Sequence, residues 1–176
     1  TFPNGKIDLP QGDRDGAVKY TDYALGKFIN QAKTKPWFKN TVFVIVADHC
    51  ASSAGKWEIN IEKHRIPAII YNLNHQQTQI DRLVSQIDLM PTLLGYLNWN
   101  YQSSFYGKDI NQTKIGDERA FTGNYRTLGL LKGNVFTQLN DKKRVTQFRW
   151  NERSKTMSEV KDTNNRFLIT QTIACY

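Results

Sequence analysis

The sequence predicts an α/β protein with a mostly parallel central sheet, followed by a small antiparallel sheet. Residues 41–47, TVFVIVA, are almost entirely apolar and rich in β-branched side chains, which is typical of a strand buried on both faces. A helix-spaced segment precedes it, and a helix leading into such a strand is half of a parallel βαβ unit. Beyond about residue 118, short segments rich in Val, Phe, Thr, Tyr and Trp alternate with turn residues, which favours an antiparallel meander.

The first elements follow from apolar spacing and from the positions of proline and glycine. Residues 1–13 contain two prolines, two glycines and no periodic apolar pattern, so we predict a loop. A helix is predicted from Arg14 onward because apolar residues recur every three or four positions, and it should end before Pro36. The apolar positions of this helix are Ala17, Val18, Ala24, Leu25, Phe28, Ile29 and Ala32.

A second strand and a second helix are predicted in the middle of the chain. Residues 66–72, IPAIIYN, are a short apolar strand candidate, and residues 80–87 carry apolar side chains at helical or mixed spacing. Asp88 can cap a helix through MPTLLGYL, in which Pro91 is tolerated in the first turn. We predict a boundary after residue 118, with residues 119–176 forming an antiparallel β-meander that includes RFLITQTI as a strand.

The composition is that of a soluble globular protein with a basic surface. Hydrophobic residues make up 39%, charged residues make up 23%, and the formal net charge is +8. This charge favours an anionic partner, namely nucleic acid, anionic lipid or a phosphorylated or sulfated substrate, or it reflects a solubilising surface. No apolar run approaches the roughly 20 residues of a membrane span. The chain begins with Thr and without a leader, so we expect a fragment or a processed piece.

An acid and an imidazole, Asp48 and His49, stand together at the end of the most apolar segment. Inside a strand these two side chains would point to opposite faces, but at its carboxyl end both can turn toward the crevice where open parallel sheets bind ligands. An unpaired buried carboxylate costs several kcal/mol, and a divalent metal is its strongest partner. Mixed oxygen and nitrogen ligands suit zinc, manganese or magnesium. The alternative is an ordinary Asp-His dipeptide without a metal, since two ligands do not complete a site.

Four segments in this order resemble the alkaline phosphatase and sulfatase superfamily. They are KYTDYALGKF, VADH, RIPAIIY and SQIDLMPTLLGYL, spread over roughly 100 residues. The closest resemblance is to bacterial sulfatase-like membrane enzymes of the lipoteichoic acid synthase and phosphoglycerol transferase type. It implies that residues 1–118 are the C-terminal half of the catalytic domain, in the C-terminal part of an alkaline-phosphatase-like sandwich.

The resemblance also implies a metal-dependent enzyme that transfers or hydrolyses a phosphate ester through a metal-activated nucleophile. Asp48 and His49 would be ligands of one divalent ion, which is manganese, magnesium, calcium or zinc. The family's nucleophile and its other acidic ligand lie upstream of this segment, so no catalytic nucleophile is assigned here and the segment alone should be inactive. A sulfuric ester hydrolase, that is a sulfatase, is the alternative enzyme. The family further implies a parent protein anchored in the bacterial cytoplasmic membrane, with this domain on the periplasmic or extracellular face.

Two residues beyond the pair are candidate substrate contacts. Lys56 and His64 can present positive charge or a hydrogen bond to a phosphoryl or sulfuryl group, although a solvated lysine and a structural histidine are the ordinary alternatives. Cys50 and Cys175 are too few for a disulfide scaffold and match no zinc motif.

Basic side chains also gather in the predicted meander, interleaved with Phe136, Phe148 and Trp150. They suit a single-stranded nucleic acid or an anionic lipid surface, and a non-catalytic basic binding module is the alternative of another class. We expect a phosphate- or sulfate-ester substrate, possibly lipid-linked, and no nucleic acid. The basic residues of this cluster are Lys132, Lys142, Lys143, Arg144, Arg149, Arg153 and Lys155.

Overall fold

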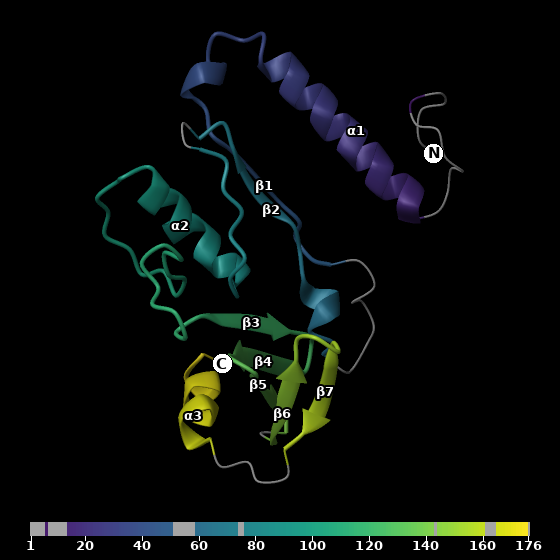
Figure 1. Cartoon of the computed structure of the whole chain (residues 1–176), viewed down its shortest axis with the longest axis vertical. Helices are drawn as coiled ribbons and strands as arrows, with labels where there is room; N and C mark the ends of the chain where they lie inside the picture. The colour runs from purple at the N-terminus through teal and green to yellow at the C-terminus, as the bar shows by residue number, and fades with distance from the viewer. Residues whose placement is uncertain are drawn as a thin grey trace. The chain divides into compact units, whose positions relative to one another are not determined.

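The computed structural model describes residues 6, 14–50, 59–73, 76–142, 144–160 and 165–175. Contacts divide the chain into two units, one of residues 1–44 with 70–74 and one of residues 45–69 with 75–176. The dividing points fall within two paired strands, β1 (Phe43–Val46) and β2 (Ala68–Tyr71), so that each unit contains one end of this pair. Figure 1 shows the elements along the chain.

The first unit is built around helix α1 (Arg14–Ala32) and the aromatic ring of Phe43. The helix begins and ends where the apolar spacing and Pro36 predicted. Phe43, at the start of β1, packs edge to face on Phe28 of α1, with ring centroids 5.9 Å apart. Three further rings lie within 6.4 Å of it, and such tilted and edge-on pairs stabilise an aromatic cluster. They belong to Trp37, Phe38 and Tyr71.

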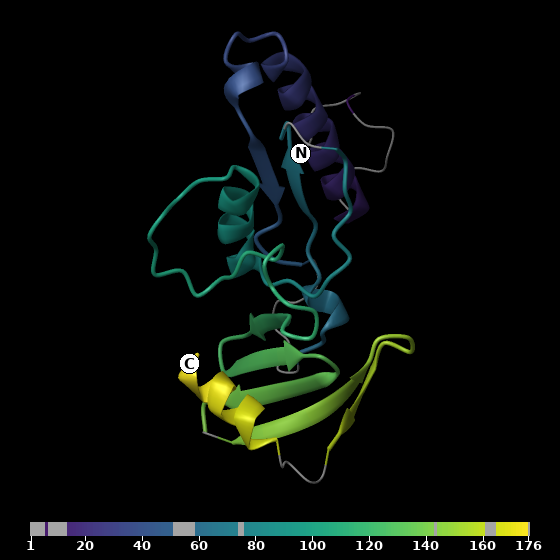
Figure 2. The same cartoon turned by 60° about the vertical axis from the view of Figure 1, so that its left-hand side comes forward.

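The β1–β2 pair is antiparallel. Phe43 at the start of β1 packs on Tyr71 at the end of β2, while the Ala47 amide just past β1 donates to the Pro67 carbonyl just before β2. Figure 2 shows the two arrows pointing in opposite directions. The strands carry half-buried side chains in β1 and partly exposed ones in β2. The mostly parallel character of the central sheet stays a prediction, because these are the only strands of that sheet among the described residues.

The second unit contains a five-stranded antiparallel meander that confirms the predicted small antiparallel sheet. Its strands follow in sequence order, each paired with the next. They are β3 (Arg119–Gly123), β4 (Thr127–Lys132), β5 (Val135–Asn140), β6 (Val145–Asn151) and β7 (Thr156–Glu159). Two short 3₁₀ turns, η2 (Glu62–His64) and η3 (Gln86–Asp88), and helix α2 (Leu89–Tyr96) precede the sheet in the chain.

Both faces of this sheet are covered. Phe136 and Thr137 are adjacent on β5 and point to opposite faces, and the side chain of each is fully buried. On one face, Phe136 forms a hydrophobic cluster with Leu131 of β4 and Trp150 of β6. Ile59 and Ile61, which precede the sheet in the chain, pack against this cluster. On the other face lies helix α3 (Arg166–Ala174), as Figures 1 and 2 show.

One prediction of secondary structure was wrong. RFLITQTI forms α3 and not a strand, because the Asn165 side chain caps the helix by accepting from the Leu168 amide. Leu168 and Thr172, four positions apart, are then both buried. Residues 80–84, whose apolar spacing was helical or mixed, lie in an irregular segment that leads into η3 and then α2. The boundary predicted after residue 118 stays a prediction.

Candidate functional site

Asp48 and His49 lie immediately after β1 and face each other. The Asp48 Oδ2 and His49 Nε2 atoms are 3.6 Å apart, and both side chains are open to solvent, 89% exposed for Asp48 and 72% for His49. The Asp48 Oδ1 atom accepts from the His49 backbone amide at 2.9 Å, which holds the carboxylate on the side of the imidazole. The pair is therefore side by side and accessible. Because the Asp48 carboxylate is exposed, the cost of burial that the sequence argument invoked does not itself require a metal partner.

The imidazole of His49 has a defined tautomer. Its Nδ1 atom lies 3.0 Å from the Cys50 carbonyl oxygen. A carbonyl oxygen only accepts, so Nδ1 carries the proton and donates, and the neutral ring is left with a lone pair on Nε2. Nε2 and the Asp48 carboxylate oxygen then face each other as two acceptors. Such an arrangement can accommodate a metal ion between the two atoms.

The separation of these two atoms fits a shared divalent ion. Zinc–nitrogen and zinc–oxygen bonds of about 2.0–2.2 Å at a tetrahedral angle put two ligand atoms about 3.4 Å apart. The observed 3.6 Å needs only a small rotation of either side chain. The donor set is also right, because carboxylate oxygen and imidazole nitrogen serve zinc and manganese alike. Asp48 and His49 thus fit two positions of a metal site.

The remaining ligands are not found near the pair in the described ranges. Among those residues no group of three or more His, Cys, Asp or Glu side chains has the geometry of a metal site. The metal role of Asp48 and His49 therefore stays a prediction that needs ligands from elsewhere. Cys50 and Cys175 are both thiols.

The predicted substrate contacts have different outcomes. Lys56 lies outside the described residues. His64 is half-buried in η2, and its Nδ1 atom is 2.7 Å from the Asn60 carbonyl oxygen, so Nδ1 donates there. No described contact joins His64 to Asp48 or His49. A substrate role for His64 stays a prediction.

The sequence analysis missed a buried carboxylate centre at Asp88. Asp88 is only 2% exposed. Its carboxylate accepts hydrogen bonds from the Arg119 guanidinium at 3.0 Å, from the Lys108 amide at 2.8 Å and from the Ser85 amide at 2.9 Å. The expectation that Asp88 caps α2 needs correction, because its side chain forms a capping box with Ser85 that closes η3 instead. The spacing Ser85-x-x-Asp88 resembles the capping-box pattern and was the available signal.

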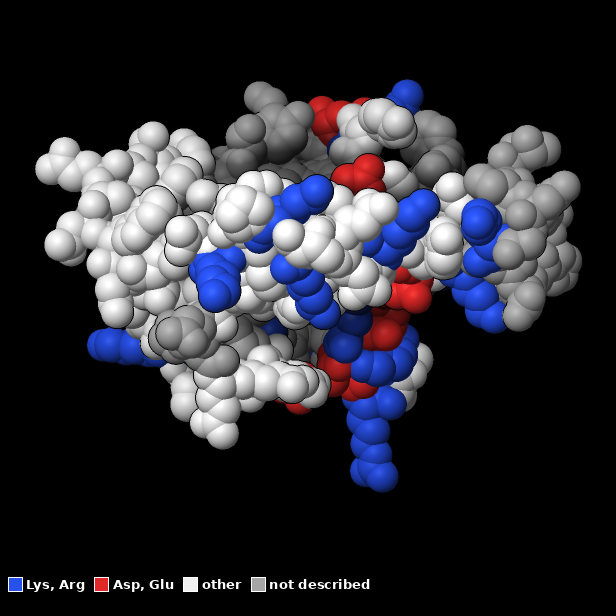
Figure 3. All heavy atoms as spheres, turned by 90° about the horizontal axis from the view of Figure 1, so that it is seen from above, with Lys and Arg blue, Asp and Glu red and all other residues white. Residues whose placement is uncertain are grey.

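Two basic residues of the predicted cluster, Lys132 and Lys155, have acidic partners. Lys155 contacts both Glu62 and Glu152, and Lys132 lies 3.5 Å from Asp117. Hydrogen bonds from Lys155, Trp150 and Arg65 lower the pKa of Glu152 to about 2. On the face seen in Figure 3, Lys and Arg side chains are scattered among uncharged residues, and some adjoin Asp and Glu. Lys143 lies outside the described residues. A basic binding surface for a polyanion stays an alternative prediction.

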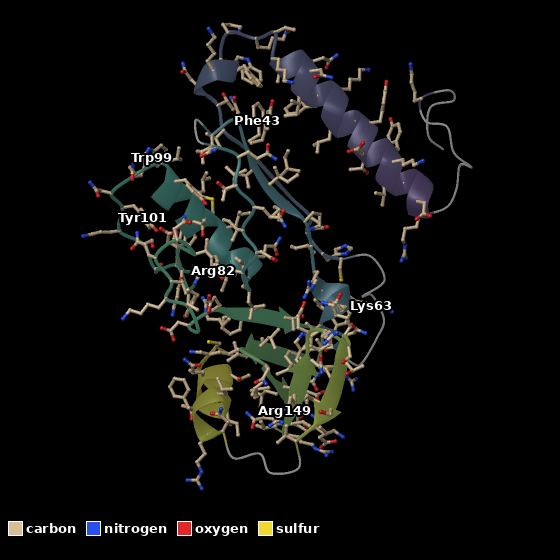
Figure 4. All side chains as sticks on the ribbon, viewed as in Figure 1. Phe43, Lys63, Arg82, Trp99, Tyr101 and Arg149 are labelled. Carbon is tan, nitrogen blue, oxygen red and sulfur yellow. The ribbon has the colours of Figure 1, made fainter. Side chains whose placement is uncertain are left out.

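An aromatic hollow of about 520 Å³ lies beside α2. Trp99, Tyr101 and Phe105 line it together with Asp109 and Lys114. Figure 4 labels Trp99 and Tyr101 in the segment that follows α2. Asp48, His49 and His64 do not line this hollow.

Comparisons with known proteins identify a family for the part of the chain that contains Asp48 and His49, and relatives of the chain. The family model described as Sulfatase matches residues 10–99, about half of the chain. Phosphoglycerol transferase I of Citrobacter koseri is 34% identical over 74 residues, which are 42% of this chain and 10% of that protein. The enzyme of the same name from Escherichia fergusonii is 39% identical over 52 residues, which are 30% of this chain and 7% of that protein. The matched segments thus span a tenth or less of these relatives.

The fold comparison extends over nearly the whole chain. The solved structure of a protein in the alkaline phosphatase superfamily from Vibrio parahaemolyticus matches with a TM-score of 0.88 and 29% sequence identity. The match covers 99% of this chain and 43% of that chain. Since the family model covers the α1–β1–β2–α2 region and the superfamily fold continues through α3, the chain belongs to the sulfatase family within the alkaline phosphatase superfamily.

Proposed function

We propose that the protein is a metal-dependent, sulfatase-like enzyme that transfers or hydrolyses a phosphate ester, of the phosphoglycerol or phosphoethanolamine transferase type. The observation that supports this most is the approach of Asp48 Oδ2 to His49 Nε2 at 3.6 Å, directly after β1 and open to solvent. The similarity to phosphoglycerol transferase I over 74 residues supports a phosphoester in place of a sulfate ester.

The two residues have different roles in this proposal. Asp48 supplies a carboxylate oxygen whose charge neutralises part of the ion, and His49 supplies Nε2 while its Nδ1 proton is held by the Cys50 carbonyl. One divalent ion, manganese, magnesium, calcium or zinc, would activate a nucleophile and neutralise charge on the transferring group when bound. The nucleophile itself is expected upstream of these residues, so we expect the segment by itself to be inactive.

A sulfuric ester hydrolase is the second candidate, favoured by the description of the matching family model. Both candidates need the same Asp48–His49 pair, so the pair does not distinguish them. The two candidates differ in the ester group that the enzyme turns over.

The proposed setting is a bacterial membrane surface. None of the helices in the described part of the chain is long and apolar enough to cross a bilayer. We propose that the parent protein is anchored in the cytoplasmic membrane, with this domain on the periplasmic or extracellular face and a substrate that is lipid-linked. This setting follows from the resemblance of the sequence to sulfatase-like bacterial membrane enzymes.

The test is a substrate comparison with the full-length protein. It is incubated with manganese and either phosphatidylglycerol or an aryl sulfate, and the products are followed by phosphorus NMR and by sulfate release. We expect phosphoglycerol transfer or release, reduced at least 100-fold by Asp48→Ala and by His49→Ala, and changed less than twofold by the turn variant Asp141→Ala. Turnover of the sulfate alone would favour the second candidate, and phosphoglycerol turnover that survives both site variants would contradict the proposal.

A further inference from the structure

Ala47, the residue that leads into Asp48, is held on both its amide and its carbonyl side. The Ala47 amide donates to the Pro67 carbonyl at 3.3 Å, which continues the pairing of β1 with β2. The Ala47 carbonyl accepts from the side-chain amide of Gln86, with Nε2 and the oxygen 3.0 Å apart. Because this carbonyl belongs to the peptide bond shared with Asp48, the direction of that plane decides where the Asp48 side chain begins.

Gln86 comes from a rigid part of the second unit. It is the first residue of η3, whose two ends are tied by the Ser85 amide donating to Asp88 Oδ2 and by the Asp88 amide donating to the Ser85 carbonyl, each at 2.9 Å. Asp88 is in turn fixed by Arg119 of β3, which contacts both of its carboxylate oxygens at 3.0 and 3.1 Å. The Gln86 backbone therefore has little freedom, although its side chain is exposed.

The geometry points to Gln86 as a positioning residue for the Asp48–His49 pair, an inference that rests on the proposed metal site. By donating to the Ala47 carbonyl, Gln86 fixes the peptide plane from which the Asp48 carboxylate reaches the imidazole. Without this donor the Ala47 carbonyl loses its described partner, and the described hydrogen bond left on Ala47 is that of its amide to Pro67, one peptide earlier. The Ala47–Asp48 peptide plane can then rotate, and Oδ2 and Nε2 sample a wider range of separations. A metal ion would then have to order the two ligands itself, which lowers its affinity.

The chemistry of the contact tells which substitution is informative. Glutamate has the size of glutamine but no side-chain donor at neutral pH, and it would place a carboxylate oxygen against the Ala47 carbonyl oxygen. Gln86→Glu thus removes the hydrogen bond and adds repulsion, while Gln86→Ala only removes the bond. Gln102 is a matched control, because it is exposed, makes no described side-chain hydrogen bond and can undergo the same change of charge.

The experiment titrates manganese into the metal-free, full-length protein by calorimetry and records the melting temperature without metal. We expect the affinity to fall about tenfold in Gln86→Glu and about threefold in Gln86→Ala, with a metal-free melting temperature within about 2 °C of the wild type. Gln102→Glu should change the affinity less than twofold. A role in folding alone would lower the melting temperature without changing the affinity of the folded fraction.

The same titration of Asp48→Asn separates this inference from the proposed function. If Asp48→Asn loses manganese binding while both Gln86 variants keep the wild-type affinity, the positioning role is overturned and the metal site stands. If Asp48→Asn keeps the affinity, the metal site itself fails, and the positioning role fails with it. If Gln86→Glu does not fold, the result for Gln86→Ala decides.

Discussion

The approach of Asp48 to His49 depends on hydrogen bonds made by their own backbone. The His49 amide holds one carboxylate oxygen, and the Cys50 carbonyl fixes the imidazole tautomer. Both contacts are local in sequence, and they act on the two side chains themselves, whereas the distant Gln86 acts on the peptide before them. This explains how two adjacent side chains, which would diverge inside a strand, come to face one another at its end.

Asp88 is a buried carboxylate whose removal should cost the second unit much of its stability. Asp88→Ala would leave the Arg119 guanidinium, whose side chain is 12% exposed, without its carboxylate partner. Loss of one partner from a buried pair typically costs about 3–5 kcal/mol. We expect that decrease in the free energy of unfolding, measured by urea denaturation. Asp141→Ala, which removes a half-exposed partner of Arg126, should cost less than about 1 kcal/mol. Equal effects of the two variants would contradict the role of Asp88.

Glu152 predicts a pH dependence of stability. Its pKa is lowered from 4.5 to about 2 because Lys155, Trp150 and Arg65 donate hydrogen bonds to the carboxylate. A lowered folded-state pKa stabilises the protein above pH 4.5, and this contribution is lost as the pH falls from 4.5 toward 2. Since the side chain is 60% exposed, we expect at most about 1 kcal/mol.

The measurement compares wild type with Glu152→Gln by urea denaturation at several pH values. The difference in unfolding free energy should be largest near neutral pH and should shrink below pH 4.5. A difference that stays constant down to pH 2.5 would show that ionisation of Glu152 contributes nothing.

Among the helices and strands, the sequence predicted those that are determined by residues close together in the chain. The apolar spacing of residues 17–32 and the proline at position 36 define α1, and the β-branched run defines β1. The meander was also predictable, because its turns contain residues such as Gly133, which has a positive φ of 57°. These features depend on residues close in sequence.

The elements that were missed depend on tertiary contacts. The α3 segment contains Ile, Thr and Phe, which favour strands, yet Leu168 and Thr172 gain burial against the sheet only in a helix. The ligands beyond Asp48 and His49, and the contact from Gln86 to Ala47, join residues that no local pattern connects. Gln86 lies 39 positions from Ala47, so nothing in the sequence near the pair indicated it.

Two glycine-to-alanine substitutions test the packing around strand β4 and helix α1. A Cβ atom on Gly129 of β4 would lie 2.5 Å from the ring of Phe136, which is fully buried, so the ring would have to shift. We expect Gly129→Ala to destabilise the protein by about 1–3 kcal/mol. A Cβ atom on Gly26 of α1 meets nothing within 4 Å, so Gly26→Ala should stabilise it by about 0.5–1 kcal/mol. Thermal unfolding of both variants checks the pair, and shifts of the same sign would contradict this packing.

For the whole molecule, the central claim is that a sulfatase-family chain brings one carboxylate and one imidazole to a divalent ion. The family membership and the fold support the class of enzyme, while the metal, the nucleophile and the ester belong to the proposed function. The Gln86 contact links the site to the meander through η3, Asp88 and Arg119. The melting temperature and the affinity for the ion should therefore be measured on the same protein.

The most direct measurement is manganese binding by the metal-free, full-length protein, compared among wild type, Asp48→Asn, His49→Gln and the control Asp141→Asn. We predict that each of the first two substitutions weakens binding by more than about 100-fold, since each removes a ligand, and that the control stays within twofold. Wild-type affinity in both Asp48→Asn and His49→Gln would contradict the account.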